Sequence, residues 1–107
     1  QLWKVSDPDG RTVLHYAALF GNYSLAMLAL DSGLPVDTAS GAGQTPLMYA
    51  AMRNNISIMR KLLDAGANPC QRDAAGGTPV MFAARHGCLN AALLLVRRAG
   101  AIQRQRA

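Results

Sequence analysis

The sequence lacks several features on which other classes of protein depend. Its 107 residues include two cysteines, Cys70 and Cys88, which are too few for a disulfide framework and do not have the spacing of a zinc site. Aromatic residues make up 6% of the chain, whereas alanine, leucine and glycine are plentiful, and this mixture favours closely packed helices over a β-sandwich. Glutamate is absent altogether. We therefore expect one mostly helical domain with two reduced, structural thiols, as in an intracellular protein of the cytoplasm or nucleus.

Long apolar runs are absent as well. No uninterrupted apolar stretch reaches the roughly 18 residues that a membrane-spanning helix needs, and the first residues do not have the pattern of a signal peptide. The sequence therefore predicts a soluble chain with no membrane insertion. Because it begins at Gln1 and not at a methionine, a targeting signal further upstream stays open. Half of the residues are apolar, which is enough to build a core.

What the sequence does contain is a motif that recurs every 33 residues. Segments that begin at Asp7, Ser40 and Asp73 align without a gap. The matched columns are Gly10, Gly43 and Gly76; Thr12, Thr45 and Thr78; Ala17-Ala18, Ala50-Ala51 and Ala83-Ala84; and Gly21, Asn54 and Gly87. This recurrence predicts repeats over about residues 7–39, 40–72 and 73–105, within a single domain of residues 1–107. Residues 1–6 are then expected to be the tail of a preceding repeat or a cap, and the chain an excerpt of a longer protein.

The sequence of each repeat predicts two helices. Thr45 and Thr78 can cap the first helix through their hydroxyls, with a proline in its first turn, and Thr12 is expected to do the same beside Val13. That helix runs for about nine residues. It ends at Gly21, Asn54 or Gly87, where we expect the left-handed conformation, which asparagine tolerates best among residues with a side chain. The second helices are expected over roughly residues 24–32, 57–65 and 90–99, each ending before a further glycine at position 33, 66 or 100.

Further residues complete a wider pattern of Gly, Thr-Pro-Leu-His, Ala-Ala, Gly, Leu-Leu and Gly-Ala. It is carried by Gly10, Thr12, Leu14, His15, Ala17, Ala18, Gly21 and Gly33; by Thr45, Pro46, Leu47, Leu62, Leu63, Gly66 and Ala67; and by Thr78, Pro79, Gly87, Gly100 and Ala101. Over almost the whole chain this pattern resembles the ankyrin repeat family. The resemblance implies an all-α solenoid of stacked helix-turn-helix units with short hairpin-like turns. Met48 and Met81 replace the histidine that His15 retains, so we expect weaker turn-stabilising hydrogen bonds in the second and third repeats.

The first helix of each repeat has two different sides, because residues three and four apart share one side of a helix. One side is small and apolar and is expected to be buried between repeats: Leu14, Ala17 and Ala18; Leu47, Ala50 and Ala51; and Val80, Ala83 and Ala84. The other side carries an aromatic ring at Tyr16, Tyr49 or Phe82. We expect these three rings to pack between the two helices of their own repeats.

The second side also carries pairs of larger side chains that the repeat itself does not need. These are Leu19 and Phe20, Met52 and Arg53, and Arg85 and His86. The resemblance to ankyrin proteins implies that this side looks out from a concave surface where partner proteins dock. Aromatic residues and arginine dominate the binding energy of interfaces. We therefore predict that these six residues bind another protein, and that the chain is a scaffold, recruitment or regulatory module.

Charge is distributed unevenly along the chain. Residues 1–52 contain two basic residues and four aspartates, whereas residues 53–107 contain nine basic residues and two aspartates. Net charges of −2 and +7 on the two halves would steer an acidic partner toward the C-terminal half, so we expect an acidic and apolar protein segment. The candidate arginines are Arg72, Arg85, Arg97, Arg98, Arg104 and Arg106. Arg60 and Lys61, on a second helix, are expected to be ordinary solvated surface.

Other kinds of function compete with this interpretation. The isoelectric point of about 9.9 is compatible with nucleic-acid binding, but no aromatic residues alternate with the basic ones of the tail and no known DNA-reading helix is present. Catalysis is disfavoured because His15 takes a structural position, and His86 has no serine, cysteine or acid at the spacing of a triad. Cys88 is expected to point away from His86. We predict no catalytic residue, metal, cofactor or small-molecule substrate, and the stack could also be the targeting or regulatory arm of a larger enzyme or channel.

Overall fold

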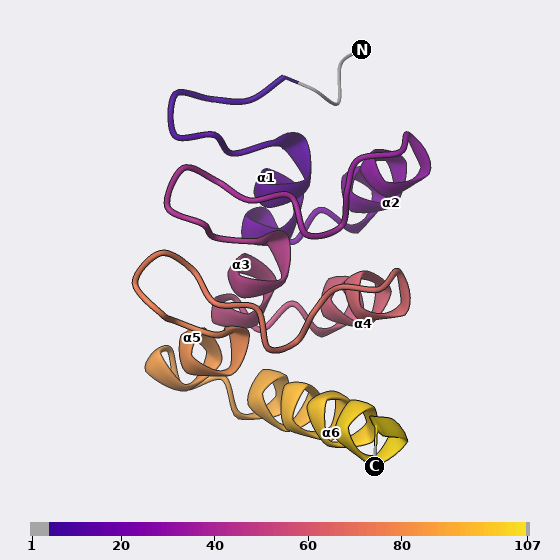
Figure 1. Cartoon of the computed structure of the whole chain (residues 1–107). Helices are drawn as coiled ribbons and strands as arrows, with labels where there is room; N and C mark the ends of the chain where they lie inside the picture. Colours follow the sequence, from indigo (N-terminus) through magenta and orange to yellow (C-terminus); the bar gives the residue numbers. More distant parts are fainter. Residues whose placement is uncertain (1–4, 107) are drawn as a thin grey trace.

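The computed structural model describes residues 5–106, with side chains up to Ala101 (Figure 1). Its helices are α1 (Val13–Phe20), α2 (Tyr23–Asp31), α3 (Pro46–Met52), α4 (Ile56–Asp64), α5 (Pro79–Arg85) and α6 (Leu89–Arg106). No strand forms within residues 5–106. Each repeat contributes one pair of helices, α1 with α2, α3 with α4 and α5 with α6, and the pairs follow one another along the stack (Figure 1). The prediction of an all-α stack of helix-turn-helix units is confirmed.

The helices form two layers. The first helices make one layer, in which α1 packs on α3 and α3 packs on α5, while α2, α4 and α6 make the other (Figure 1). Small side chains let the first helices approach closely, and Ala17, Ala18, Ala50, Ala51 and Ala83 are fully buried. The side of α1 and α3 that the sequence predicts to be buried is therefore buried in the structure.

The third repeat departs from that prediction. Ala84 is exposed and Val80 is only partly buried, although both belong to the side predicted to be buried. In the first two repeats the next helix pair covers these positions. Within the described residues, α5 has a first-layer neighbour on the α3 side and none on the other. The buried side of the repeat thus becomes an outer surface at this end of the stack.

Hairpin-like turns lead into the first helices. In the second turn, the N–H of Ser40 donates to the carbonyl of Gln44 at 2.9 Å, and successive turns are joined because the N–H of Ala74 donates to the carbonyl of Ala42 at 2.9 Å. Gly43 has a φ angle of +76°, and a Cβ at this position would lie 2.9 Å from the backbone nitrogen of Ala74. The turn therefore requires glycine both for its conformation and for the contact between repeats.

The ends of the first helices agree with the sequence. Gly21, Asn54 and Gly87 all have positive φ angles, and that of Asn54 is 57°. The helices themselves are seven or eight residues long, slightly shorter than predicted. A left-handed residue thus separates the two helices of every repeat.

The end of α6 does not agree with the sequence. This helix has 18 residues and continues through Gly100, instead of ending at residue 99. Gly33 and Gly66 are followed within three residues by Pro35 and Pro69, which cannot continue a helix, whereas no proline follows Gly100. Most residues after Gly100 are good helix formers. A glycine alone was too weak a stop signal at this position.

His15 makes the hydrogen bonds that its position suggests. Its Nδ1 accepts a hydrogen bond from the backbone N–H of Thr12 at 3.0 Å, and its Nε2 donates to the carbonyl of Gln44 at 2.8 Å. The second bond joins the first repeat to the turn of the second. A methionine thioether has no N–H to donate, so it cannot make such a link.

Of the three predicted threonine caps, only that of Thr45 forms a side-chain cap hydrogen bond. At Thr12 the hydroxyl lies 3.1 Å from Nδ1 of His15 instead. The hydroxyl of Thr45 accepts a hydrogen bond from the N–H of Met48 at 3.4 Å. The hydroxyl of Thr78 is buried and has no hydrogen-bond partner, so the predicted cap is wrong at this residue. The reason is that the N–H of Met81, which would donate to it, donates to the carbonyl of Thr78 at 3.0 Å.

The three aromatic residues of the first helices do not share one environment. Tyr49 and Phe82 are buried, whereas Tyr16 is 37% exposed, so its predicted burial is wrong. The hydroxyl of Tyr49 accepts from Nε of Arg11 at 2.9 Å, and its ring lies 5.4 Å from that of His15. Tyr49 therefore packs against the preceding repeat and not simply between its own two helices. Tyr16 is more exposed because no described repeat precedes it.

Candidate functional site

The ends of the three first helices lie side by side. The six residues predicted to bind a partner occupy matching positions there: Leu19 and Phe20 end α1, Met52 ends α3 with Arg53 as its cap, and Arg85 ends α5 with His86 as its cap. Because α1 packs on α3 and α3 packs on α5, these three pairs form one continuous row. We call these six residues the helix-end row.

The helix-end row combines exposed and half-buried side chains. Phe20 is 71% exposed, and the arginines and the histidine of the row are exposed as well. Leu19 and Met52 are half-buried and pack against the core. The row thus offers an apolar start at α1 and a basic end at α5, on a base that the core holds in place.

An aromatic pair stands at the α1 end of the row. The rings of Tyr16 and Phe20 are one helical turn apart and stack, with their centroids 6.3 Å apart and their planes 7° apart. The Tyr16 hydroxyl donates a hydrogen bond to Asp7, which lowers the pKa of that carboxyl. Asp7 therefore stays ionised near neutral pH. The sequence pattern grouped Tyr16 with the packing aromatics, so its contribution to the surface was missed.

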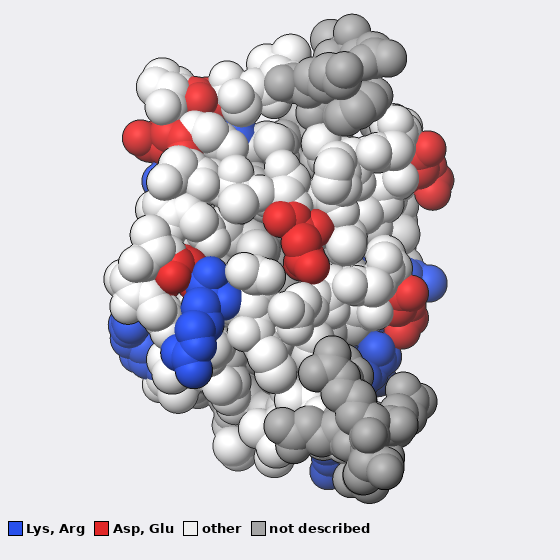
Figure 2. Space-filling view, viewed as in Figure 1, with Lys and Arg blue, Asp and Glu red and all other residues white. Residues whose placement is uncertain are grey.

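The basic end of the row lies on α5. The guanidinium carbon of Arg85 is 5.4 Å from the centroid of the Phe82 ring, which is a cation–π arrangement. Acidic side chains gather toward the N-terminal end of the stack and basic ones toward the C-terminal half (Figure 2). The charge gradient of the sequence is therefore also a gradient in space.

The other candidate arginines are not gathered at the helix-end row. Arg98 donates to Asp64 at 3.0 Å, and the side chain of Arg72 donates to the carbonyl of Gly76 at 2.9 Å. Arg97 is exposed on α6. The side chains of residues 104 and 106 lie outside the described part of the structure, as do residues 1–4 of the predicted N-terminal tail.

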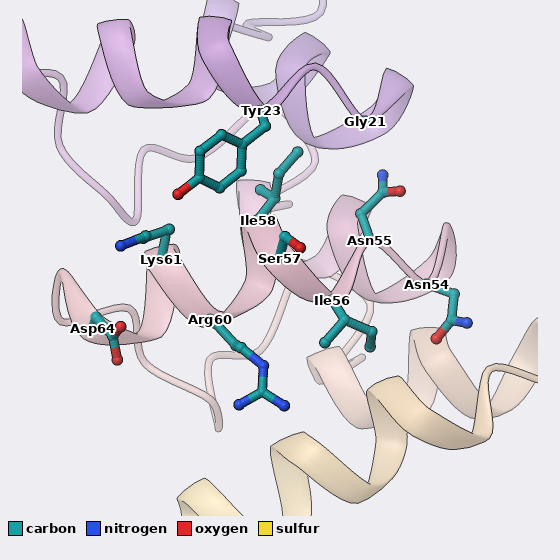
Figure 3. Close-up of a pocket in the computed structure, with 10 residues that line it drawn as sticks. All are labelled: Gly21, Tyr23, Asn54, Asn55, Ile56, Ser57, Ile58, Arg60, Lys61 and Asp64. Atoms are coloured by element: carbon teal, nitrogen blue, oxygen red, sulfur yellow. The ribbon is translucent and has the colours of Figure 1, made fainter.

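A groove of about 730 Å³ lies elsewhere, between the second helices α2 and α4 (Figure 3). It is lined by Gly21, Tyr23, Asn54, Asn55, Ile56, Ser57, Ile58, Arg60, Lys61 and Asp64, and none of these belongs to the helix-end row. Arg60 points toward α6 whereas Lys61 extends in a different direction, and both are exposed (Figure 3). Because its two cations diverge, the groove does not concentrate positive charge on one point.

Polar residues that bridge successive repeats were missed by the sequence analysis. Nδ2 of Asn55 donates to the carbonyl of Ala18 at 2.7 Å and so fixes the end of α1. Oδ2 of Asp37 accepts from the backbone N–H of Asn68 at 3.0 Å, and burial of this carboxyl raises its pKa. The only available signal was position, because Asn55 stands 33 residues after Asn22. These bridges hold the repeats, and with them the helix-end row, in register.

The two cysteines have different surroundings, and both are free thiols. Cys88 is half-buried, packs against the core, and its Sγ donates to the carbonyl of Met52 at 3.5 Å. Cys70 is exposed, so the prediction that both thiols are structural fits Cys88 only. His86 is exposed, and the Cys88 thiol lies 3.7 Å from its carbonyl oxygen.

Comparison with known families agrees with this geometry. A family model described as "Ankyrin repeats (3 copies)" matches residues 2–73 and again residues 36–106. Among curated proteins, none matches the sequence. In the part of the chain that the structure describes, no helix is both long and apolar enough to cross a membrane.

Proposed function

Because the chain belongs to the ankyrin repeat family, whose repeats are generally protein–protein interaction modules, we propose that it binds a partner protein along the helix-end row. The bound segment is acidic and apolar, and the chain acts as a scaffold, recruitment or regulatory domain. Ankyrin repeat domains are typically non-catalytic, which agrees with this role.

The exposure of Phe20 carries the proposal. This ring is 71% exposed at the end of α1, although the neighbouring alanines of the same helix are fully buried. Burying a phenylalanine side chain contributes about 1.5–3 kcal/mol, so a partner that covers this ring gains most of that amount. Aromatic anchors of this kind are frequent hot spots of interfaces.

The basic end of the row supplies the second part of the recognition. Arg53, Arg85 and His86 are exposed, and no carboxylate among the described residues forms a salt bridge with either arginine. Exposed charges of one sign mainly raise the rate of association with an acidic partner, and salt screens this effect. An acidic segment would therefore lie toward α5 with its apolar part over Phe20.

The proposal separates into parts that kinetics can measure. With a partner isolated from the source cells, surface plasmon resonance would follow Phe20→Ala, Arg53→Ala and Arg85→Ala at about 50 and 300 mM salt. Phe20→Ala is expected to raise the dissociation rate by about tenfold, because it removes buried apolar area. The arginine variants are expected to slow association by a few fold and to flatten its salt dependence.

Tyr23→Ala is the matched control, because Tyr23 is an exposed aromatic residue that lines the groove between α2 and α4. It is expected to leave binding unchanged. All variants should keep the parent's circular dichroism. A partner that binds the three row variants like the parent, or that responds only to Tyr23→Ala, would place the interface on the second helices and contradict the proposal.

A further inference from the structure

The ring of Phe20 is held from one side by the ring of Tyr16. The two residues lie one turn apart on α1, and their rings stack with centroids 6.3 Å apart and planes 7° apart. Phe20 is 71% exposed, and an exposed phenylalanine on a helix ordinarily exchanges between two χ1 rotamers. The stack favours the rotamer in which the two rings meet.

Tyr16 is in turn fixed through its hydroxyl, which donates a hydrogen bond to Oδ2 of Asp7. The other carboxylate oxygen of Asp7 accepts from the N–H of Asp9 at 2.9 Å and from the N–H of Arg11 at 2.8 Å. A guanidinium nitrogen of Arg11 also lies 3.5 Å from Oδ2 of Asp7. Both carboxylate oxygens therefore have partners, and the Tyr16 hydroxyl is tied to the turn that leads into α1.

That turn is itself well anchored. The N–H of Asp7 donates to the carbonyl of Arg11 at 3.0 Å, and the N–H of Gly10 donates to the carbonyl of Asp7 at 2.9 Å. The turn also contacts the second repeat, because the N–H of Gly41 donates to the carbonyl of Asp9 at 2.7 Å. The chain of contacts from Phe20 thus ends in backbone that is hydrogen-bonded within its own turn and to the next repeat.

The stacking of the repeats does not require these contacts. At the position of Tyr16, the second repeat has Tyr49, whose hydroxyl donates to Gln44 at 2.7 Å, and the third has Phe82, which has no hydroxyl. At the position of Phe20, both of these repeats carry basic side chains. The second and third repeats form the same pair of helices without the contacts that hold Phe20, so the reason for them lies outside the fold.

We propose that Tyr16 and Asp7 are positioning residues that hold the Phe20 ring in one orientation before a partner binds. This inference rests on the proposed function, in which Phe20 is the apolar anchor of the helix-end row. A side chain that becomes immobile on binding loses rotamer entropy, and an anchor that is fixed beforehand avoids that loss. The partner packs on Phe20, and Tyr16 acts through this ring.

The first test needs no partner. The chain has two phenylalanines, Phe20 and Phe82, so isotopic labelling of phenylalanine gives two separate sets of NMR signals. The three-bond couplings to Cγ measure the χ1 rotamer populations. In the parent, Phe20 is expected to keep one rotamer, as the buried Phe82 does. Tyr16→Ala is expected to average the Phe20 couplings over two rotamers. Tyr16→Phe, which keeps the ring and loses the bond to Asp7, should give intermediate values.

The second test uses the partner protein isolated with the parent chain as bait, and it separates positioning from direct contact. Tyr16→Phe is expected to weaken binding by about twofold and Tyr16→Ala by about threefold to tenfold. In a Phe20→Ala background, the same two substitutions should change nothing further, because they act only through that ring. Tyr23→Phe is the matched control: it removes the hydroxyl of another exposed tyrosine and should leave couplings and binding unchanged.

The outcomes distinguish this inference from the proposed function. Phe20 couplings that are averaged in the parent, or unchanged in Tyr16→Ala, would overturn the positioning role and leave the proposed function standing. Parent-like binding of Tyr16→Ala, or a loss that adds in full to that of Phe20→Ala, would also overturn it, since full additivity means that Tyr16 touches the partner itself. Parent-like binding of Phe20→Ala would instead overturn the proposed function, and with it any role of the held ring in binding.

Discussion

His15 shows how one side chain can join two repeats. Its ring is fully buried, with Nδ1 accepting from the N–H of Thr12 and Nε2 donating to the carbonyl of Gln44. These partners fit a neutral ring with its proton on Nε2. A second proton, on Nδ1, would point at the N–H of Thr12 and break that contact. Burial also disfavours the charged ring and lowers the pKa of His15.

We predict that the free energy of unfolding decreases as the pH falls, because the unfolded state takes up a proton on His15 more readily than the folded state does. The unfolded pKa of histidine is about 6.5, and the folded pKa of His15 lies below it, so the unfolded state binds the proton first. The stabilisation is complete above about pH 6.5 and is lost as the pH falls through the folded pKa, by at most about 1.4 kcal/mol per pH unit. Urea unfolding between about pH 7.5 and 5.0 would measure it.

The second repeat supplies the control variant for this prediction. Met48 occupies the position of His15 and is also fully buried, so His15→Met should fold and should flatten the pH dependence. His86 is exposed and remains in this variant. A pH dependence that survived His15→Met unchanged would assign the effect to another group.

At the scale of the elements, the start of α6 depends on a residue of the preceding repeat. Oδ1 of Asn54 accepts a hydrogen bond from the N–H of Ala91, the third residue of α6, at 3.3 Å. The first N–H groups of a helix have no partner within the helix, so this acceptor acts as a cap from outside. Asn54 therefore ends one helix with its left-handed backbone and supports the start of another with its side chain.

This double role changes what substitution of Asn54 should do. Backbone conformation alone predicts that Asn54→Gly is neutral or slightly stabilising, but the lost hydrogen bond should make it destabilising by about 0.5–1.5 kcal/mol. Asn54→Asp keeps the acceptor and adds negative charge at the start of α6, so it should match the parent. Asn54→Val should cost most, because a β-branched residue resists a φ angle of 57°. Thermal unfolding would rank the three variants, and a glycine variant as stable as the parent would show that the bond to Ala91 contributes nothing.

The sequence was sufficient for the type and order of the helices, because a threonine before the first helix and a pair of alanines within it recur in every repeat, and a proline follows the threonine in two of the three. It was not sufficient for the end of α6. The glycine at position 100 matches Gly33 and Gly66, yet the outcome depends on the proline that follows those two and is missing after Gly100. The importance of the following proline became visible only when the ends of α2, α4 and α6 were compared in the structure.

At the scale of the whole molecule, the place of a repeat in the stack determines which of its side chains are exposed and can contribute to a binding site. The buried alanines of the sequence pattern indicate which sides of α1 and α3 are free, and this was enough to place the helix-end row at one edge of the stack. The exposure of Ala84 was not predicted, because the same pattern assigns this residue to the buried side. Burial at that position depends on a neighbouring repeat, which is a property of the stack and not of the local sequence.

The column of Ala18, Ala51 and Ala84 leads to the last prediction. Ala51 is 0% exposed between α3 and α5, so Ala51→Leu must force extra carbon atoms into a closely packed seam and should cost about 1–3 kcal/mol. Ala84→Leu makes the same chemical change on an exposed surface and should stay within about 0.5 kcal/mol of the parent. Urea unfolding of both variants at low protein concentration would measure the difference. If Ala84→Leu were as destabilising as Ala51→Leu, position 84 would be covered in solution, and its exposure at this end of the described stack would be wrong.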